Sequence, residues 1–207
     1  LEGSVAAVLP RVAELAMEST VCVLASGDPL FYGVGSLVVK SLGAEHVEVI
    51  PHPSSAQWAF ARLGMAWHDA LFLSVHGRAL RGVASRLRHA QKVAILTDAE
   101  SSPARIASHL LDHGSGAWRA WVAEDLAGAG ERVRPFALAD LARETDFAAL
   151  NVLVLERIGP RPPVLPHLEE AAFERRMPKK GLITKREVRT LALALLRLRL
   201  DAVVWDI

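Results

Sequence analysis

The sequence predicts a protein of the α/β class, in which short apolar strands alternate with helices. Short runs of valine, leucine, isoleucine and alanine recur along the chain, which is typical of strands. Segments with helical periodicity and clear terminal signals lie between these runs. The chain of 207 residues is 51% hydrophobic and 23% charged, which is enough to bury a substantial core. This alternation indicates mostly parallel sheets with helices on their faces.

The expected strands are rich in aliphatic and β-branched residues. Several of them are apolar at every position, which is typical of strands that are buried on both faces. In chain order, the expected strands span residues 20–25, 47–50, 70–75, 92–97, 118–123 and 150–156.

Two of the expected helices have clear terminal signals. Ser102 is a candidate N-cap, Pro103 suits the first helical position, and Gly114 follows the last expected helical residue. The second helix begins on the serines of the segment SSAQWAFARLG and ends at Gly64. Both segments are therefore expected to form helices that cover a sheet.

Two segments divide the chain into parts. GMAWHDA, at 64–70, separates two βα blocks and can join two lobes. IGPRPPVLPH, at 158–167, is rich in proline, which disfavours both helices and central strands. The expected parts are a first α/β lobe at 1–66, a second lobe at 67–159, a linker at 160–183 and the start of another module at 184–207.

The last part of the sequence is expected to hold a helix and then a strand. Thr184 followed by Glu187 matches a capping box. A strand then begins in the closing run AVVWDI. The apolar face of the expected helix consists of Val188, Leu191, Leu195 and Leu198.

Composition and charge exclude several classes of protein. A formal net charge of +1 gives no reason to expect a nucleic-acid or membrane partner. Cys22 is the only cysteine, so a disulfide framework is excluded and a reducing compartment is expected. The first residues lack a signal-peptide pattern, and no apolar stretch reaches the roughly 20 residues that a bilayer requires. We therefore expect a soluble, cytoplasmic protein.

The loop SGDPLFYGVG follows the first expected strand, at the sheet edge where α/β proteins bind ligands. Gly27 allows close approach of the backbone to a ligand, Asp28 can accept hydrogen bonds, and Pro29 stiffens the turn. Gly33 and Gly35 lie near the start of the next helix, whose free amides favour an anion. The alternative is a plain strand-to-helix turn with Asp28 as a cap, and the residues alone do not decide between the two.

The segment LASGDPLFYGVG resembles the signature of the tetrapyrrole methylases, S-adenosylmethionine-dependent enzymes of cobalamin and sirohaem synthesis. Together with SVHGR, it is most similar to a branch that methylates a precorrin during corrin synthesis. The resemblance extends from about residue 21 to residue 159. It implies a two-lobed fold with two α/β sheets and a cofactor cleft between them. It also implies S-adenosyl-L-methionine as the methyl donor, a precorrin as the substrate and a homo-oligomer.

The resemblance implies cofactor contacts in both lobes. They come from the GDP loop, from the segment HPSSAQWA and from strand ends of the second lobe. The serines of HPSSAQWA could equally cap a helix, and the strand-end residues could equally be packing residues. His52 stands where the family usually has glycine. The expected cofactor-binding residues are Gly27, Asp28, Pro29, Gly33, Ser54, Ser55, Leu96, Thr97 and Ala123.

His76 and Arg78 of the segment SVHGR are the candidate substrate-binding residues. The planar guanidinium group of Arg78 suits bidentate pairing with a substrate carboxylate. His76 could accept or shuttle a proton. The alternative is an exposed loop histidine and a solvated arginine.

The tail MPKKGLITKREVRTLALALLRLRLDAVVWDI resembles the opening of a second, Rossmann-like methyltransferase module. In that module a strand that ends in aspartate leads into a glycine-rich loop, and here the strand reaches Asp206. The family's own opening strand and glycine-rich turn are not found before Leu1. We therefore expect the later part of one methylase, which would methylate C5. The second module would methylate C15 and promote decarboxylation.

Several other features are set aside. His109 and His113 are four residues apart, but Leu110 replaces the glutamate of the HExxH pattern, so no metal is expected. No catalytic side chain is identified, because the methyl group of the cofactor is already activated. The basic residues of the tail suggest a solvated helix face first, carboxylate binding second and nucleic-acid binding a distant third. The alternative functions are methylation of another tetrapyrrole or substrate, and a cofactor-binding scaffold without activity.

Overall fold

The computed structural model describes residues 5–160, 184–197 and Val204. The chain divides into two compact units, 1–160 and 161–207. The expected linker at 160–183 and the expected closing strand fall almost entirely outside the described residues, and Val204 itself is not in a strand. No helix in the described part of the chain is both long and apolar enough to cross a membrane.

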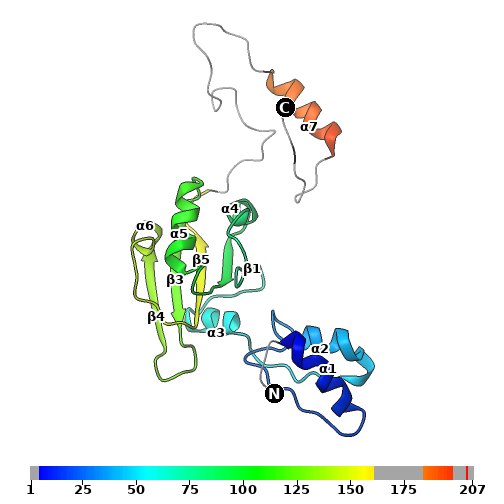
Figure 1. The fold of residues 1–207 in the computed structure, drawn as a ribbon. Helices are drawn as coiled ribbons and strands as arrows, with labels where there is room; N and C mark the ends of the chain where they lie inside the picture. The colour runs from blue at the N-terminus through cyan, green and yellow to red at the C-terminus, as the bar shows by residue number, and fades with distance from the viewer. Residues whose placement is uncertain (1–4, 161–183, 198–203, 205–207) are drawn as a thin grey trace. The chain divides into compact units, whose positions relative to one another are not determined.

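One five-stranded sheet forms the centre of the first unit (Figure 1). Its strand order is β1-β2-β5-β3-β4. The expected strands at 70–75, 92–97, 118–123 and 150–156 are confirmed as β1, β2, β3 and β5. The strand bounds are Ala70–Ser74 for β1, Lys92–Leu96 for β2, Trp118–Glu124 for β3, Arg132–Ala137 for β4 and Asn151–Arg157 for β5.

The prediction of a mostly parallel sheet is wrong for these strands. Only β1 and β2 pair in parallel, whereas β5 runs antiparallel to both β2 and β3, and β3 runs antiparallel to β4. A parallel pair needs a long crossover, usually a helix, whereas a short connection joins antiparallel neighbours. Residues 125–131 form such a short connection between β3 and β4. The sequence analysis did not predict β4, whose sequence RVRPFA is interrupted by arginines and a proline.

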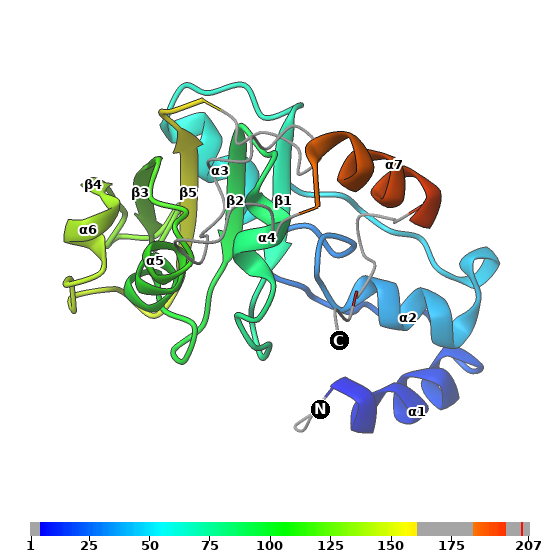
Figure 2. The same cartoon turned by 90° about the horizontal axis from the view of Figure 1, so that it is seen from above.

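Helices cover both faces of the sheet, with α4, α5 and α6 on one face and α3 on the other (Figure 2). The strands alternate accordingly, because Val93 and Ile95 face the first group while Ala94 faces α3. The helix bounds are Val5–Ala16 for α1, Gly35–Leu42 for α2, Ala44–His46 for the 3-10 helix η1, Ser55–Arg62 for α3, Val83–Leu87 for α4, Pro103–Asp112 for α5, Leu138–Leu141 for α6 and Arg186–Leu196 for α7.

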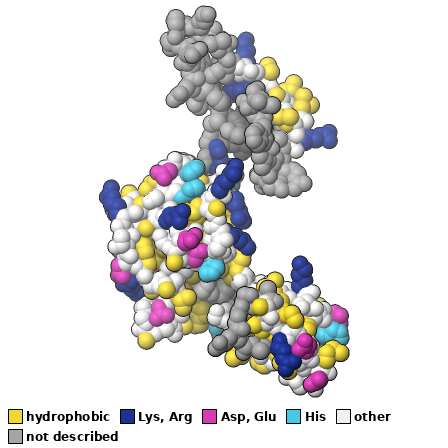
Figure 3. All heavy atoms as spheres, viewed as in Figure 1, with side chains coloured by type: hydrophobic (Ala, Val, Ile, Leu, Met, Phe, Trp, Pro, Cys, Tyr) yellow, Lys and Arg dark blue, Asp and Glu magenta, His cyan; other side chains and the backbone are white. Residues whose placement is uncertain are grey.

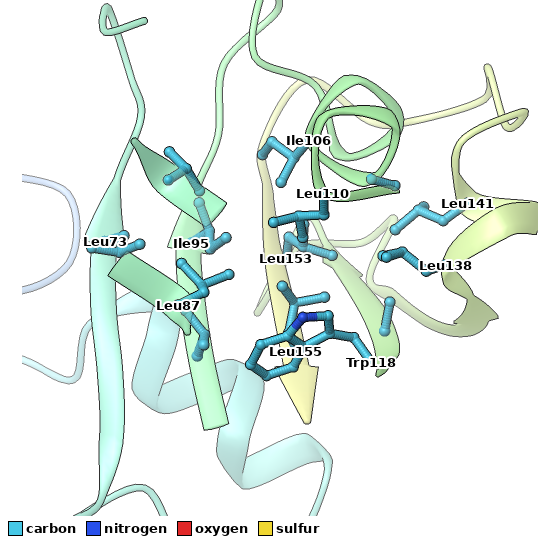
Figure 4. Packing of buried hydrophobic residues seen from close by; sticks show 14 of the residues in the cluster. Leu73, Leu87, Ile95, Ile106, Leu110, Trp118, Leu138, Leu141, Leu153 and Leu155 are labelled. Atoms are coloured by element: carbon cyan, nitrogen blue, oxygen red, sulfur yellow. The ribbon is translucent and has the colours of Figure 1, made fainter. Parts of the chain in front are cut away.

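The larger core lies between the sheet and helices α4, α5 and α6 (Figure 4). Ile106 and Leu110 of α5 point at Ile95, Leu153 and neighbouring strand residues, and all are fully buried. Each such aliphatic side chain contributes about 2 kcal/mol of transfer free energy on burial. The smaller core, under α3, contains Ala56, Ala59, Phe60, Ala94, Ala123, Val152 and Val154.

The two helices with clear sequence signals are confirmed together with their ends. The Ser102 hydroxyl accepts from the backbone N–H of Arg105 at 3.3 Å, and Gly114 has φ +65° after α5. At α3, the backbone N–H of Gln57 donates to the Ser54 hydroxyl at 3.3 Å. The Gln57 side-chain oxygen in turn accepts from the backbone N–H of Ser54 at 2.8 Å, which completes a capping box.

Two expected strands of the first lobe do not form, so those predictions are wrong. Residues 20–25 and 47–50 carry no strand pairing, and Leu24 and Ile50 are 90% and 76% exposed. A strand exists only where a neighbour accepts and donates its backbone hydrogen bonds. Nothing in the described part of the chain takes that place beside either segment. Of the two sheets that the resemblance implies, the described residues form the second.

The second unit contains α7, which confirms the helix expected after residue 184. The expected capping box is wrong, because the helix starts at Arg186 and Lys185 occupies the N-cap position without a side-chain hydrogen bond. Val188, Leu191 and Leu195 are 55%, 61% and 73% exposed in this structure. Leu198, the last member of the expected apolar face, lies outside the described residues.

Candidate functional site

The sheet topology brings three chain segments together at one edge. β1 and β2 are parallel, so Ser74 lies beside Leu96 where both strands end. β5 runs the other way and begins here, which sets Val152 beside Leu96. The loops that follow β1 and β2 therefore lie next to each other and next to the start of β5.

Asp98 ties the loop after β1 to the loop after β2. One of its carboxylate oxygens accepts from the backbone N–H of Gly77 at 2.5 Å, and the other accepts from that of Ser101 at 2.5 Å. These hydrogen bonds hold the pKa of Asp98 below its usual value. His76 Nδ1 lies 3.4 Å from the carbonyl oxygen of Thr97, so two predicted site residues are neighbours. The sequence analysis missed Asp98, although an aspartate directly after a buried strand is a recognisable signal.

The Thr97 side chain is buried and points to the start of β5. Its hydroxyl oxygen lies 2.6 Å from Oδ1 of Asn151 and 3.0 Å from the Asn151 carbonyl oxygen. Asn151 Nδ2 donates to the carbonyl oxygen of Ala148 at 2.8 Å. The backbone N–H of Ala148 donates to Glu124 Oε1 at 2.8 Å. A chain of hydrogen bonds thus connects a predicted cofactor residue to a carboxylate inside the protein.

Glu124 is fully buried and is held between two arginines. Arg132 and Arg134 each bring Nε to 2.9 Å from its Oε2 atom. Burial would raise the pKa of Glu124, but hydrogen bonds from Arg134, the Ala148 N–H and Arg132 outweigh it and lower the pKa. The carboxylate is therefore charged and can hold the loop that leads into β5. Only its place beside Ala123 in the sequence could have drawn attention to Glu124.

The GDP loop is a compact turn with Asp28 at its centre. Asp28 Oδ1 accepts from the backbone N–H groups of Leu30 at 2.8 Å and Phe31 at 3.1 Å. This is the capping geometry of the second interpretation, in which Asp28 caps a strand-to-helix turn. A Cβ atom at Gly33 or Gly35 would lie 2.6 Å or 2.7 Å from the carbonyl oxygen of Pro29, so both positions require glycine.

The GDP loop lies against the start of α3. Gly27 has φ +69°, and a Cβ atom there would lie 3.9 Å from Cα of Ser54 and 4.0 Å from the backbone nitrogen of Ser55. Ser54 is buried in its capping box, whereas Ser55 is exposed. The structure therefore brings together the first two groups of predicted cofactor residues. His52, which stands where the resemblance implies a glycine, is exposed in the adjoining segment.

Aromatic contacts connect the GDP loop to the sheet. Phe31 packs edge-to-face against Tyr32 and Phe72, with ring centroids 5.0 Å and 5.3 Å apart. The Tyr32 hydroxyl donates to the carbonyl oxygen of Phe72 in the edge strand β1 at 3.1 Å. Tyr32 has φ 55°, a left-handed conformation that is uncommon for a residue with a side chain. The sequence analysis did not single out Tyr32.

The two groups of predicted residues border the same apolar cluster. Phe31 from the GDP loop and Leu96 at the end of β2 both pack against the smaller core under α3. Ala123 is fully buried within that core. Arg78 is exposed, like His76. The structure therefore gathers several of the predicted positions around the apolar cluster between α3 and the sheet, and their roles stay predictions.

Charged side chains of both signs lie on the surface of the sheet unit. Figure 3 shows Lys and Arg, Asp and Glu, and His side chains close together on the visible face of the sheet unit. In the described ranges, no group of three or more His, Cys, Asp and Glu side chains could hold a metal ion. The rings of His109 and His113 lie 4.1 Å apart, and His113 Nδ1 lies 2.7 Å from the His109 carbonyl oxygen.

Comparisons with known proteins agree with the resemblance. The profile of the tetrapyrrole (corrin/porphyrin) methylases matches residues 2–142. The chain is 38% identical over 212 residues to the precorrin-6Y C(5,15)-methyltransferase (decarboxylating) of Sinorhizobium sp. That alignment covers 100% of this chain and 49% of the relative. The chain thus spans about half the length of this curated relative.

Two further matches cover most of the first unit. The cobalt-precorrin-7 C(5)-methyltransferase of Salmonella typhimurium is 35% identical over 133 residues, which are 64% of this chain and 65% of that protein. A uroporphyrin-III C-methyltransferase from Thermus thermophilus, complexed with S-adenyl homocysteine, matches with a TM-score of 0.59. The match has 19% identity and covers 74% of this chain and 73% of that one, so it shows the fold alone.

Proposed function

Because the chain belongs to the tetrapyrrole (corrin/porphyrin) methylase family, we propose that it is part of an S-adenosylmethionine-dependent methyltransferase acting on a precorrin. The observation that carries this proposal is the 38% identity, over the whole chain, to a precorrin-6Y C(5,15)-methyltransferase (decarboxylating). The reaction proposed for this part is methylation of C5 in cobalamin synthesis. Methylation of C15 and decarboxylation are proposed for the second module, whose start we expect at 184–207.

The cofactor is proposed to bind at the GDP loop and the adjoining strand ends. Three features support this assignment. Gly27 has no side chain that would cover its backbone, and Ser55 is exposed beside it. The Thr97 hydroxyl group is held by Asn151. The full set is Gly27, Asp28, Pro29, Gly33, Ser54, Ser55, Leu96, Thr97 and Ala123. Of these, Ser54, Thr97 and Ala123 are buried, so their contribution would be to shape the backbone.

The proposed reaction mainly requires the protein to align the methyl donor with the acceptor carbon. Bound S-adenosylmethionine supplies an activated methyl group for transfer to carbon. The chain has to hold donor and acceptor carbon in line and exclude water, which needs no nucleophilic side chain. His76 and Arg78, both exposed at the end of β1, are proposed to contact the precorrin. A homo-oligomeric state and a cytoplasmic location complete the proposal.

A methyl-transfer assay on the complete protein tests this proposal. Incubation with S-adenosylmethionine and the precorrin should add one methyl group to the macrocycle and release one equivalent of S-adenosylhomocysteine, both followed by mass spectrometry. Failure of both would overturn the proposal. Cofactor binding without transfer would instead support a scaffold without activity, and transfer to other tetrapyrroles alone would change the substrate.

Substitution of Gly33 tests whether the GDP loop belongs to the cofactor site. In Gly33→Ala the new Cβ would lie 2.6 Å from the Pro29 carbonyl oxygen, so the loop must change shape. We expect methyl transfer to fall by at least about a hundredfold. Gly116→Ala is the matched control, because its Cβ would lie an ordinary 3.5 Å from Cδ2 of Leu111. Equal activity of the two folded variants would remove the GDP loop from the cofactor site.

A further inference from the structure

A cavity of about 450 Å³ opens beside the predicted substrate residue Arg78. The loop after β1 forms one wall, and the loop that leads from β2 into α5 forms the other. The cavity therefore adjoins the contact between His76 and the Thr97 carbonyl oxygen. Its lining residues are Gly77, Arg78, Ala79, Leu80, Asp98, Glu100, Ser101 and Arg105.

Two guanidinium groups share this cavity, and the hydrogen bonds described for both use neutral acceptors. Arg105 Nη1 donates to the backbone carbonyl oxygen of Glu100 at 2.9 Å, and Arg78 Nη1 lies 3.5 Å from that of Ser74. Neither arginine takes part in the ion pairs of the described residues, in contrast to Arg134, which pairs with a buried carboxylate. Two like charges in one cavity favour an anionic ligand between them.

The two acids of the cavity differ in what they can do. Both carboxylate oxygens of Asp98 are already used by the backbone N–H groups of Gly77 and Ser101. Asp98 therefore shapes the wall of the cavity. Glu100 is exposed and takes part in none of the ion pairs found in the described ranges. Its carboxylate is available to compete with an anionic ligand for Arg78 and Arg105.

We propose that this cavity binds a carboxylate side chain of the substrate macrocycle, with Arg78 and Arg105 as its cationic ligands and Glu100 as a competing anion. This inference rests on the proposed function, because that substrate class carries many carboxylates. A guanidinium group is planar and matches a carboxylate with two parallel hydrogen bonds. The positive end of α5, which starts at Pro103, adds a favourable field. An anchored substrate would lie beside His76 and Thr97.

Steady-state kinetics of the complete protein with its precorrin test the proposal. Arg105→Gln should raise KM about tenfold, since it removes charge-assisted hydrogen bonds to the substrate. Glu100→Gln should lower KM about threefold because it removes the competing charge. The dissociation constant for S-adenosylhomocysteine should stay within about twofold of wild type in both variants. Arg86→Gln is the charge-matched control, since Arg86 is exposed on α4 and does not line the cavity.

The outcomes separate this inference from the function on which it rests. If wild type turns over the precorrin while Arg105→Gln and Glu100→Gln both keep the KM of Arg86→Gln, the cavity does not bind the substrate carboxylate. If Arg105→Gln raises KM for the precorrin and also weakens the binding of S-adenosylhomocysteine, the arginine shapes the cofactor site and the proposal is wrong. If wild type fails to turn over the precorrin, the proposed function fails and this inference fails with it.

Discussion

Thr97 shows how a single residue of the site is positioned. Its hydroxyl group is fixed by Asn151, and Asn151 is fixed through Ala148 by the buried carboxylate of Glu124. The resemblance was enough to select Thr97 from the sequence. Asn151 and Glu124 could not be selected in this way, because Asn151 lies 54 residues further along the chain. Only the antiparallel pairing of β5 with β2 and β3 brings them to Thr97.

Substitution of Thr97 tests this connection. Thr97→Val keeps the shape but leaves Asn151 Oδ1 without its hydroxyl donor, so the free energy of unfolding should fall by about 1 kcal/mol. The affinity for S-adenosylhomocysteine should fall with it. Thr97→Ser retains the hydroxyl and should stay close to wild type in both. Urea unfolding measures the stability of the variants, and calorimetric titration measures their affinity for S-adenosylhomocysteine. Equal values for Thr97→Val and Thr97→Ser would contradict the role assigned to the hydroxyl group.

His109 predicts a pH dependence of stability. Burial and the nearby His113 lower the pKa of His109, and its buried Nε2 has no hydrogen-bond partner among the described residues. The folded state therefore resists protonation, while the unfolded chain takes up a proton below about pH 6.5. Stability should accordingly fall as the pH drops from 7.5 to 5.5. The buried carboxylate Glu124, whose pKa is lowered, should lose its contribution only below about pH 4.5.

Thermal melting at these two pH values measures the effect. His109→Gln should show a smaller loss of Tm on acidification than wild type. His89→Gln, at an exposed position, should lose as much Tm as wild type. A wild-type Tm that is equal at pH 7.5 and 5.5 would contradict the assignment.

Pairing partners decide which apolar segments become strands. Residues 92–97 and 150–156 were predicted correctly, and they pair with each other in the sheet. Residues 20–25 and 47–50 have the same apolar character but do not pair within the described chain. Periodicity and composition reveal the tendency of a segment, whereas its hydrogen-bonding neighbours are a property of the fold. For the same reason β4 was missed, since its arginines reach the buried Glu124 across the hairpin.

Arg157 joins the end of β5 to the end of α4. Its side chain is buried, with Nη2 2.9 Å from the Leu87 carbonyl oxygen and 3.1 Å from that of Arg88. Nε donates to the Ala90 carbonyl oxygen at 2.9 Å, and the guanidinium carbon lies 4.1 Å from the Trp118 ring centroid. One side chain thus donates to three carbonyl groups at the end of α4, of which that of Leu87 also accepts from the backbone N–H of Ala90 at 3.0 Å.

Removal of this guanidinium group should therefore loosen α4. Arg157→Met keeps the aliphatic stem but removes the hydrogen bonds to all three carbonyl groups, so the free energy of unfolding should fall by about 2 kcal/mol. Arg119→Met is the matched control, because Arg119 is exposed and its ion pair with Glu156 is long, at 3.8 Å. Urea unfolding compares the two variants, and similar losses would contradict the capping role of Arg157.

In the first unit as a whole, one mixed sheet supports two loops, the GDP loop and the SVHGR segment, which the sequence analysis identified separately. The resemblance gave the GDP loop and the SVHGR segment because both are short and continuous in sequence. The mixed strand order and the network behind Thr97 could not be predicted, because they depend on β5 entering between β2 and β3. The cavity beside Arg78 likewise depends on two loops whose contact only the fold creates. The cofactor site is therefore the central claim at this scale.

Calorimetric titration of S-adenosylhomocysteine tests that claim most directly. Asp28→Ala removes the acceptor of two loop amides and should weaken binding at least about tenfold. Asp140→Ala is the matched control, with an exposed aspartate outside the site. For the complete protein we predict saturable binding that Asp28→Ala weakens and Asp140→Ala leaves unchanged. No binding to the complete protein, or equal binding by both variants, would contradict a cofactor site at the GDP loop.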